Sequence, residues 1–146
     1  MRNRWLLVIA TLGAPVFAWQ GGAALANQSL TIETAPVQAE VTMQCLFDFE
    51  CFETETCAES GFEATLSGKA GGLTESDMVV DVKMISDAET TPMLGVRSGA
   101  AMSLSGGSFD ARALLTIGAE GAARYTLHLI DGPLALTYLG TCKEEG

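Results

Sequence analysis

The chain has 146 residues, with 18 Asp and Glu against 8 Lys and Arg, and a formal net charge of −10. This balance argues against nucleic acid and anionic membrane surfaces as partners, because both require a basic footprint. The even number of cysteines, four, is typical of proteins that form disulfides in an oxidising compartment. We therefore expect an exported protein of the bacterial periplasm or the extracellular space.

Residues 1–26 have the pattern of a Sec-type signal peptide. Arg2 and Arg4 give a positive start, an apolar run of 15 residues follows, and Ala24-Leu25-Ala26 forms an A-x-A cleavage pattern. A membrane anchor is the alternative, but a spanning helix needs about 20 apolar residues and this run is shorter. Cleavage after Ala26 would leave 18 acidic and 6 basic residues and no stable membrane insertion.

Alternation of apolar and polar residues dominates 39–146 and predicts a single disulfide-stapled β domain, preceded by a flexible N-terminal lead-in at 27–38. The alternating upstream segments are 41–51, 62–67, 78–85 and 93–96. Turn residues, among them Gly71-Gly72, predict loops at 68–77 and 86–92. In the first segment, the residues predicted to share the core face are Val41, Met43, Cys45, Phe47, Phe49 and Cys51.

Turn signals predict the strand registers of the C-terminal part. Asp131-Gly132 predicts one hairpin, and a three-residue loop that ends at Gly121 predicts the hairpin before it. Both registers place apolar residues on one face of the sheet. The predicted cross-strand pairs are Leu129–Leu134, Leu127–Leu136, Tyr125–Tyr138, Leu115–Tyr125, Ala113–Leu127 and Ala111–Leu129.

A third hairpin is predicted at Gly106-Gly107, with Leu104 opposite Phe109 and with Met102 opposite Ala111 on the same face. One apolar face shared by four consecutive strands indicates an antiparallel meander of seven or eight strands in all. A meander must protect its edges. We therefore predict an all-β fold, a small antiparallel up-and-down β-barrel whose first strand closes on its last. A two-sheet β-sandwich is the alternative.

The cysteines have a preferred pairing. Cys45 and Cys142 fall on the core faces of the first and last predicted strands, so a bridge between them would close the barrel. Alternation argues against a turn between Cys45 and Cys51, and residues six apart in a strand are too distant for a disulfide. The segment between Cys51 and Cys57 can turn. Cys45–Cys142 with Cys51–Cys57 is therefore preferred, and the other two connectivities stay open.

The sequence contains no pattern that indicates catalysis, a metal or a cofactor. Structural zinc sites use closer cysteine spacings and histidines, whereas the only histidine, His128, falls on the outward face. C-x-x-C redox, G-x-S-x-G nucleophile and calcium-loop motifs are all missing from the sequence. We therefore expect a protein that is not an enzyme and that needs no cofactor.

Acidic residues are concentrated around the first three cysteines. Residues 27–68 carry eight acids and no Lys or Arg. A solvated face without a partner is one interpretation; the other is a binding surface for a basic exported protein. We expect a non-catalytic binding protein with this candidate interaction surface: Asp48, Glu50, Glu53, Glu55, Glu59 and Glu63.

The segment GAARYT at 121–126, followed by a C-terminal cysteine, resembles the SGxRY…C end of the exported c-type lysozyme inhibitor barrels. The resemblance implies inhibition of a basic secreted enzyme such as lysozyme. Two positions depart from the family: its serine before the glycine is Glu120 here, and its lysine on the final strands has no equivalent in LALTYLGTC. Those residues would carry inhibition, so the function does not transfer with the resemblance.

A carrier of a small apolar ligand is a further alternative. Small residues at Ala64, Ala111 and Ala113 would leave space inside a barrel. The interpretation that we favour is a filled interior, in which larger side chains occupy that space. These are Met43, Phe47, Phe49, Met102, Tyr125 and Tyr138.

Overall fold

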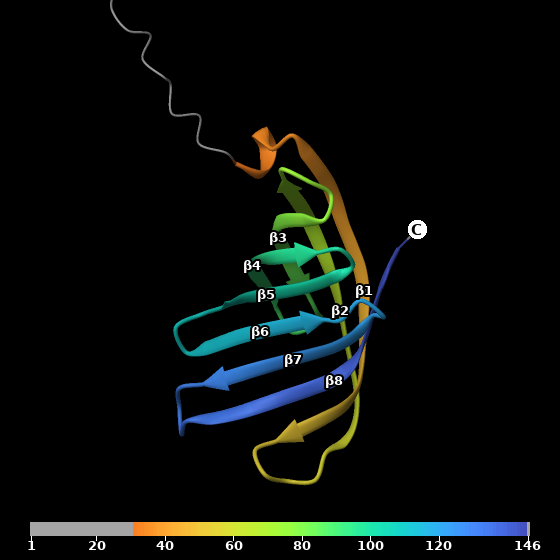
Figure 1. The fold of residues 1–146 in the computed structure, drawn as a ribbon. Coiled ribbons are helices and arrows are strands. Elements are labelled where there is room, and N and C mark those ends of the chain that lie inside the picture. The colour runs from red at the N-terminus through yellow and green to blue at the C-terminus, as the bar shows by residue number, and fades with distance from the viewer. Residues whose placement is uncertain (1–30, 146) are drawn as a thin grey trace, which may run out of the picture.

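The computed structural model describes residues 31–145 as a closed barrel of eight antiparallel strands (Figure 1). The predicted signal peptide at 1–26 lies outside these residues. A short 3₁₀ turn, η1 (Ile32–Thr34), precedes the strands. Their bounds are β1 Val37–Phe52, β2 Ala58–Gly72, β3 Asp77–Ile85, β4 Thr90–Ser98, β5 Ala101–Gly107, β6 Ala111–Ile117, β7 Ala122–Leu129 and β8 Leu134–Glu144.

Each strand pairs with the next, and β8 returns to pair with β1. The predicted up-and-down barrel is therefore confirmed, and the β-sandwich alternative is wrong. The first strand begins at Val37, so the last two residues of the predicted lead-in belong to β1. Within residues 31–145, no helix is long and apolar enough to cross a membrane.

The core lies inside the barrel because every strand alternates its side chains between the interior and the solvent. In β3, burial changes at every position, with Met78, Val80, Val82 and Met84 inside. Burying an apolar side chain of this size stabilises the fold by about 1.5–3 kcal/mol. The largest fully buried side chains are Phe47, Leu66, Met93, Leu104 and Leu115.

The registers of the last two hairpins, β6–β7 and β7–β8, are as the turns predict. Tyr125 lies opposite both Leu115 and Tyr138. Gly121 has φ +85°, the left-handed conformation that the three-residue loop requires. Turn chemistry and the apolar pattern therefore agree in this part of the chain.

The predicted register of the third hairpin, β5–β6, is wrong. Leu104 pairs with Leu115, six residues beyond the predicted partner Phe109. Met102 pairs with Ile117 rather than with Ala111. The chain turns at residues 108–110 instead, and Phe109 is 80% exposed. The apolar face survives this error because a shift by an even number of residues keeps every side chain on its side of the sheet.

Several glycines that look like turn residues are strand residues at close backbone contacts. A Cβ atom on Gly106 would lie 2.1 Å from the Pro92 carbonyl oxygen of β4. Gly71 and Gly72 lie buried near the end of β2 rather than in a loop, and a Cβ on Gly71 would lie 2.8 Å from the Ile32 carbonyl oxygen of η1. The predicted loop at 68–77 is therefore only a turn at 73–76.

The first strand contains a β-bulge at Asp48, between Phe47 and Phe49. Before the bulge, the inward residues are the odd-numbered ones that alternation predicts, ending at Phe47, which is fully buried. After the bulge the faces exchange. Phe49 pairs with the outward residue Leu139 and is 49% exposed, so the prediction that Phe49 and Cys51 share the core face is wrong.

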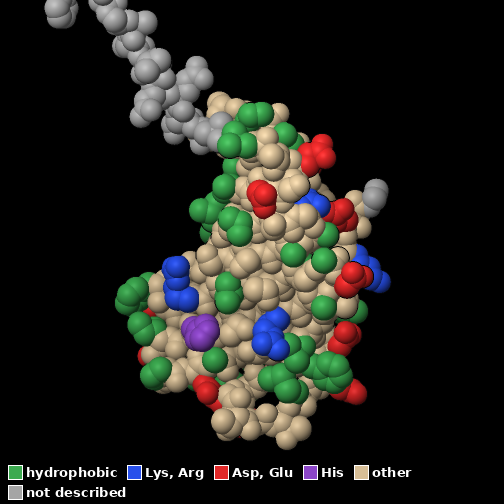
Figure 2. All heavy atoms as spheres, viewed as in Figure 1, with side chains coloured by type: hydrophobic (Ala, Val, Ile, Leu, Met, Phe, Trp, Pro, Cys, Tyr) green, Lys and Arg blue, Asp and Glu red, His purple; other side chains and the backbone are tan. Residues whose placement is uncertain are grey.

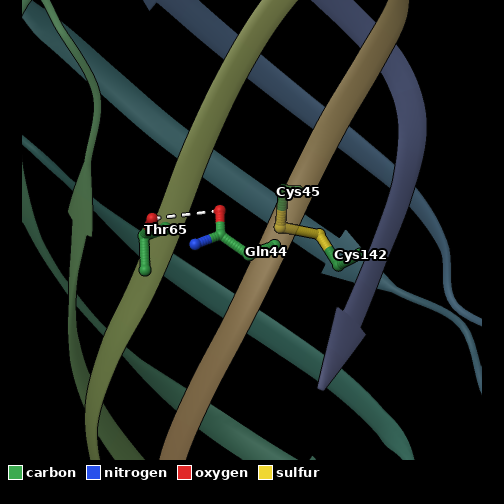
Figure 3. The surroundings of a disulfide bond; sticks show 4 residues. All are labelled: Gln44, Cys45, Thr65 and Cys142. Atoms are coloured by element: carbon green, nitrogen blue, oxygen red, sulfur yellow. Dashed lines mark hydrogen bonds between the residues drawn. A yellow bond between two sulfur atoms is a disulfide. The ribbon is translucent and has the colours of Figure 1, made fainter. Parts of the chain in front are cut away.

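Two disulfides are present, Cys45–Cys142 and Cys51–Cys57, and they have the pairing preferred from the sequence. Cys45 and Cys142 lie directly opposite each other on β1 and β8, with their Cα atoms 4.0 Å apart, so the bond spans the closure of the barrel. Figure 3 shows this bond beside a contact of the outer face, where Thr65 Oγ1 of β2 donates to Gln44 Oε1 at 3.1 Å.

Candidate functional site

The β1–β2 hairpin extends beyond the rest of the barrel wall, as the lower end of Figure 1 shows. β2 pairs with β1 from Ala58 onwards, but it pairs with β3 only from Thr65 onwards. Residues 58–64 of β2 therefore have one strand neighbour instead of two within the described part of the chain. On the other side of the hairpin, β1 remains paired with β8 as far as Phe52.

The tip of this hairpin is fastened at two points. The Cys51–Cys57 bond joins its two ends. Glu53 holds it against β8, since its backbone N–H donates to the Ala135 carbonyl at 3.1 Å and its carboxylate accepts from the Ala135 N–H. Glu53 adopts φ +49° and is the only non-glycine residue with positive φ in the described range. These contacts offset the cost of that left-handed backbone.

All six predicted surface acids belong to this hairpin, but they do not form one face. Asp48 occupies the bulge, and Glu53 and Glu55 lie in the tip. Glu59 and Glu63 occupy outward positions on β2, where Glu59 pairs with Phe49 and Glu63 with Leu46. In Figure 2, acidic side chains follow the right-hand edge of the molecule, where β1 runs in Figure 1.

The sixth acid, Glu50, points into the mouth of the barrel. It pairs with Ala58 on β2 and with Tyr138 on β8, and Tyr138 is an inward residue. The bulge causes this placement, because strict alternation would have put Glu50 outside. The two ion pairs found in residues 31–145 are Lys69–Glu40 and Arg97–Glu144, so none of the six hairpin acids has a basic partner there.

An aromatic cluster lies inside the same mouth. Its four rings are within 4.8–6.2 Å of one another, centroid to centroid. Both tyrosines of the chain belong to it. Burial, with smaller contributions from nearby carboxylates, raises the pKa of each tyrosine to about 12, so both phenols are neutral at physiological pH. The members are Phe47, Phe62, Tyr125 and Tyr138.

Two cavities flank the turn between β3 and β4 at this end of the barrel. One is a groove of about 400 Å³ beside the unpaired edge of β2, lined by Gln44, residues 61–65 and residues 85–88. The other is a pocket of about 290 Å³ between β4, β6 and β7. Ala111 and Ala113 line this pocket together with Leu127 and Tyr125, and their small side chains leave it open.

The side chains gathered at this end are of three chemical kinds. The open mouth offers carboxylates, neutral phenols and apolar walls. Residues 31–145 contain no group of three or more His, Cys, Asp or Glu side chains that could hold a metal ion. His128 is exposed on β7, opposite Arg112 of β6.

The unpaired edge of β2 and the inward position of Glu50 are not predicted from the sequence. The edge results from unequal strand lengths, because β2 begins at Ala58 whereas its pairing with β3 starts only at Thr65, opposite Ile85 at the end of β3. The bulge at Asp48 has no local sequence signal either, because the residues on both sides of it continue to alternate.

The chain was also compared with known proteins. No family model, curated protein or solved structure matches it.

Proposed function

We propose that this protein is an exported, non-catalytic binding protein that recognises a basic exported protein through its β1–β2 hairpin. The observation that carries the proposal is the set of six hairpin carboxylates, which lie on a fastened element and have no basic partner among the described residues. Unpaired carboxylates on a protruding element attract a basic partner and accelerate its association.

The fastening of the tip supports the same proposal. A surface that is ordered before binding loses little conformational entropy when a partner arrives. The disulfide and the Glu53–Ala135 contacts provide such order for the acidic tip. Both disulfides are consistent with an oxidising compartment.

The test compares two variants with equal changes in charge, using a lysozyme as a basic secreted probe. The hairpin variant carries Glu55→Gln, Glu59→Gln and Glu63→Gln. The control variant carries Glu33→Gln, Glu75→Gln and Asp81→Asn, which lie outside the hairpin. We expect the hairpin variant to weaken the Kd at low salt by at least about tenfold and the control by less than about threefold. Equal losses in both variants would show a general effect of net charge and refute the hairpin as the site.

Inhibition of lysozyme is a more specific version of this proposal. The segment that resembles the inhibitor family, however, does not belong to the β1–β2 hairpin. The segment that resembles the inhibitor family begins at Gly121, whose carbonyl accepts from the Cys142 N–H at 2.8 Å. This turn lies at the end of the barrel opposite the acidic tip. Inhibition lost in Glu120→Gln alone would indicate the family's route. If the wild-type protein neither inhibits nor binds a lysozyme at low salt, this version is wrong.

Carriage of a small apolar ligand is the second candidate function. It is favoured by the pocket of about 290 Å³ behind Ala111 and Ala113. Against it, the barrel interior is filled by larger side chains, including Phe47 and Met102. Native mass spectrometry of freshly purified protein tests this candidate, because a carrier should retain a co-purifying molecule. If the measured mass were that of the protein alone in several independent preparations, this candidate function would be ruled out.

A further inference from the structure

The unpaired edge of β2 leaves a place in the barrel wall for one more strand. Residues 58–64 lack the neighbour that β3 provides from Thr65 onwards. The Phe62 backbone N–H donates instead to the Ser60 hydroxyl oxygen at 3.2 Å, within its own strand. A free edge offers alternate N–H and C=O groups to an extended segment of another chain.

Space is available where this strand would lie. The groove of about 400 Å³ runs between residues 61–65 of β2 and residues 85–88 at the end of β3. A Cβ atom on Gly61 would have no neighbour within 4 Å, so the outward face of β2 is open at this position. The site therefore combines an unpaired edge with a cavity beside it.

The charges on this edge disfavour a second copy of the chain as the occupant. Antiparallel pairing of two copies about Gly61 would place Glu59 of each copy opposite Glu63 of the other, both on the outward face. Like charges directly opposite each other destabilise a strand pair, whereas opposite charges stabilise it. The same two carboxylates therefore favour a strand that carries basic residues.

The inward-facing residues of this edge determine which other side chains a bound strand must carry. Phe62 and Ala64 point inward, and Phe62 belongs to the aromatic cluster. A strand added beside β2 would alternate its side chains in step with this pattern. Every second residue of that strand would then lie over an apolar surface, and the residues between them would face Glu59 and Glu63.

We propose that residues 58–64 of β2 bind one extended segment of a basic partner protein as an added strand, in which basic outward residues alternate with apolar inward residues. This inference rests on the proposed function and adds its mode of recognition. The backbone of the segment supplies affinity through hydrogen bonds to β2, and its side-chain alternation supplies specificity.

Synthetic peptides test the proposal directly. The first probe is a heptapeptide of alternating Lys and Val, and the second has the same composition with Lys and Val in separate blocks. Two further probes are the alternating peptide N-methylated either at every Lys or at every Val. Only one of these two sets of N–H groups can face β2. We expect the alternating peptide to bind at least about tenfold tighter than the block peptide, and one N-methylated form, but not the other, to lose binding.

Protein variants provide the complementary test. Glu59→Gln with Glu63→Gln should weaken the Kd of the alternating peptide by about fivefold, the effect of two cross-strand charge pairs. Glu75→Gln with Asp81→Asn removes the same charge outside the hairpin and should leave the Kd unchanged. Titrations by NMR would also locate the bound peptide through the shifts of residues 58–64.

The outcomes separate this inference from the function on which it rests. Equal binding of all four peptides would overturn strand addition, while the lysozyme comparison of the hairpin and control variants could still support the acidic hairpin as a site. A dimer in solution that must dissociate before the peptide binds would make a second copy the occupant and also overturn the inference. If the hairpin variant and the control variant bound lysozyme equally well, both proposals would be overturned.

Discussion

The two parts of β1 on either side of its bulge differ although they belong to one strand. Residues 37–47 pair with β2, from Met43 onwards they also pair with β8, and they bury alternate side chains in the core. Residues 48–52 follow the bulge, expose Phe49 and turn Glu50 inward, and their partner strand β2 has a free edge. Each part carries one cysteine of a disulfide. The single extra residue at the bulge, Asp48, thus separates a part of β1 that closes the barrel from a part that carries exposed acidic residues.

The largest expected effect comes from the disulfide of the first part. Replacing Cys45 and Cys142 by Ala removes a bond between residues separated by 97 positions. On the loop-entropy model, this should lower the free energy of unfolding by about 4–5 kcal/mol. Chemical denaturation without reductant measures it. A loss below about 1 kcal/mol would mean that strand pairing alone holds the barrel closed.

Two phenylalanines on either side of the bulge provide the next comparison. Phe47 is fully buried against three other rings, so Phe47→Ala should cost about 3–5 kcal/mol of stability. Phe49 is half-exposed on the outer face, so Phe49→Ala should cost less than about 1 kcal/mol. Chemical denaturation of the two variants measures both losses of stability. Similar losses would mean that alternation continues through Asp48 and that the bulge is absent.

The disulfide of the second part should contribute less. Cys51 and Cys57 are six positions apart, so replacing both by Ala should lower the free energy of unfolding by about 2 kcal/mol on the same model. Hydrogen exchange should show faster opening of residues 52–57 while the core strands stay protected. A loss as large as that of Cys45 and Cys142 would contradict the division of β1 into two parts.

The smallest expected effect concerns Glu53, which holds the tip against β8. Glu53→Ala removes the carboxylate acceptor and keeps the left-handed backbone, so it should destabilise the protein by about 1 kcal/mol. Glu53→Gly loses the same acceptor but adopts positive φ without strain, so it should be the more stable variant of the two. Thermal unfolding of the pair is the measurement. If Glu53→Gly were the less stable variant, the strain at this position would be negligible.

The fold could be predicted largely because side-chain parity is resistant to errors in register. Leu104 pairs with a different residue from the predicted one, yet it lies on the predicted face because the two registers differ by an even number of residues. The predicted turn position is wrong because a Gly-Gly pair can indicate either a turn or a close backbone approach. Gly106 is an example of the second, since the Pro92 carbonyl leaves no room for a side chain.

The candidate site could be predicted only in part. The clustering of acids near Cys51 was visible in the sequence, and the structure places all six on one hairpin. Their division among outward, tip and inward positions depends on the bulge at Asp48, which the continued alternation concealed. The free edge depends on where β3 ends relative to β2, a relation between two strands that local pattern does not contain.

The position of the Cys45–Cys142 bond also has a consequence for the order of events during folding. The other strand contacts are between neighbours in the chain, so each hairpin can form locally and early, and Cys51 can meet Cys57 within the first of them. Cys45 and Cys142 meet only when the first and last strands come together. Their oxidation therefore requires a closed barrel, so a molecule that contains the Cys45–Cys142 bond is one whose first and last strands have already paired.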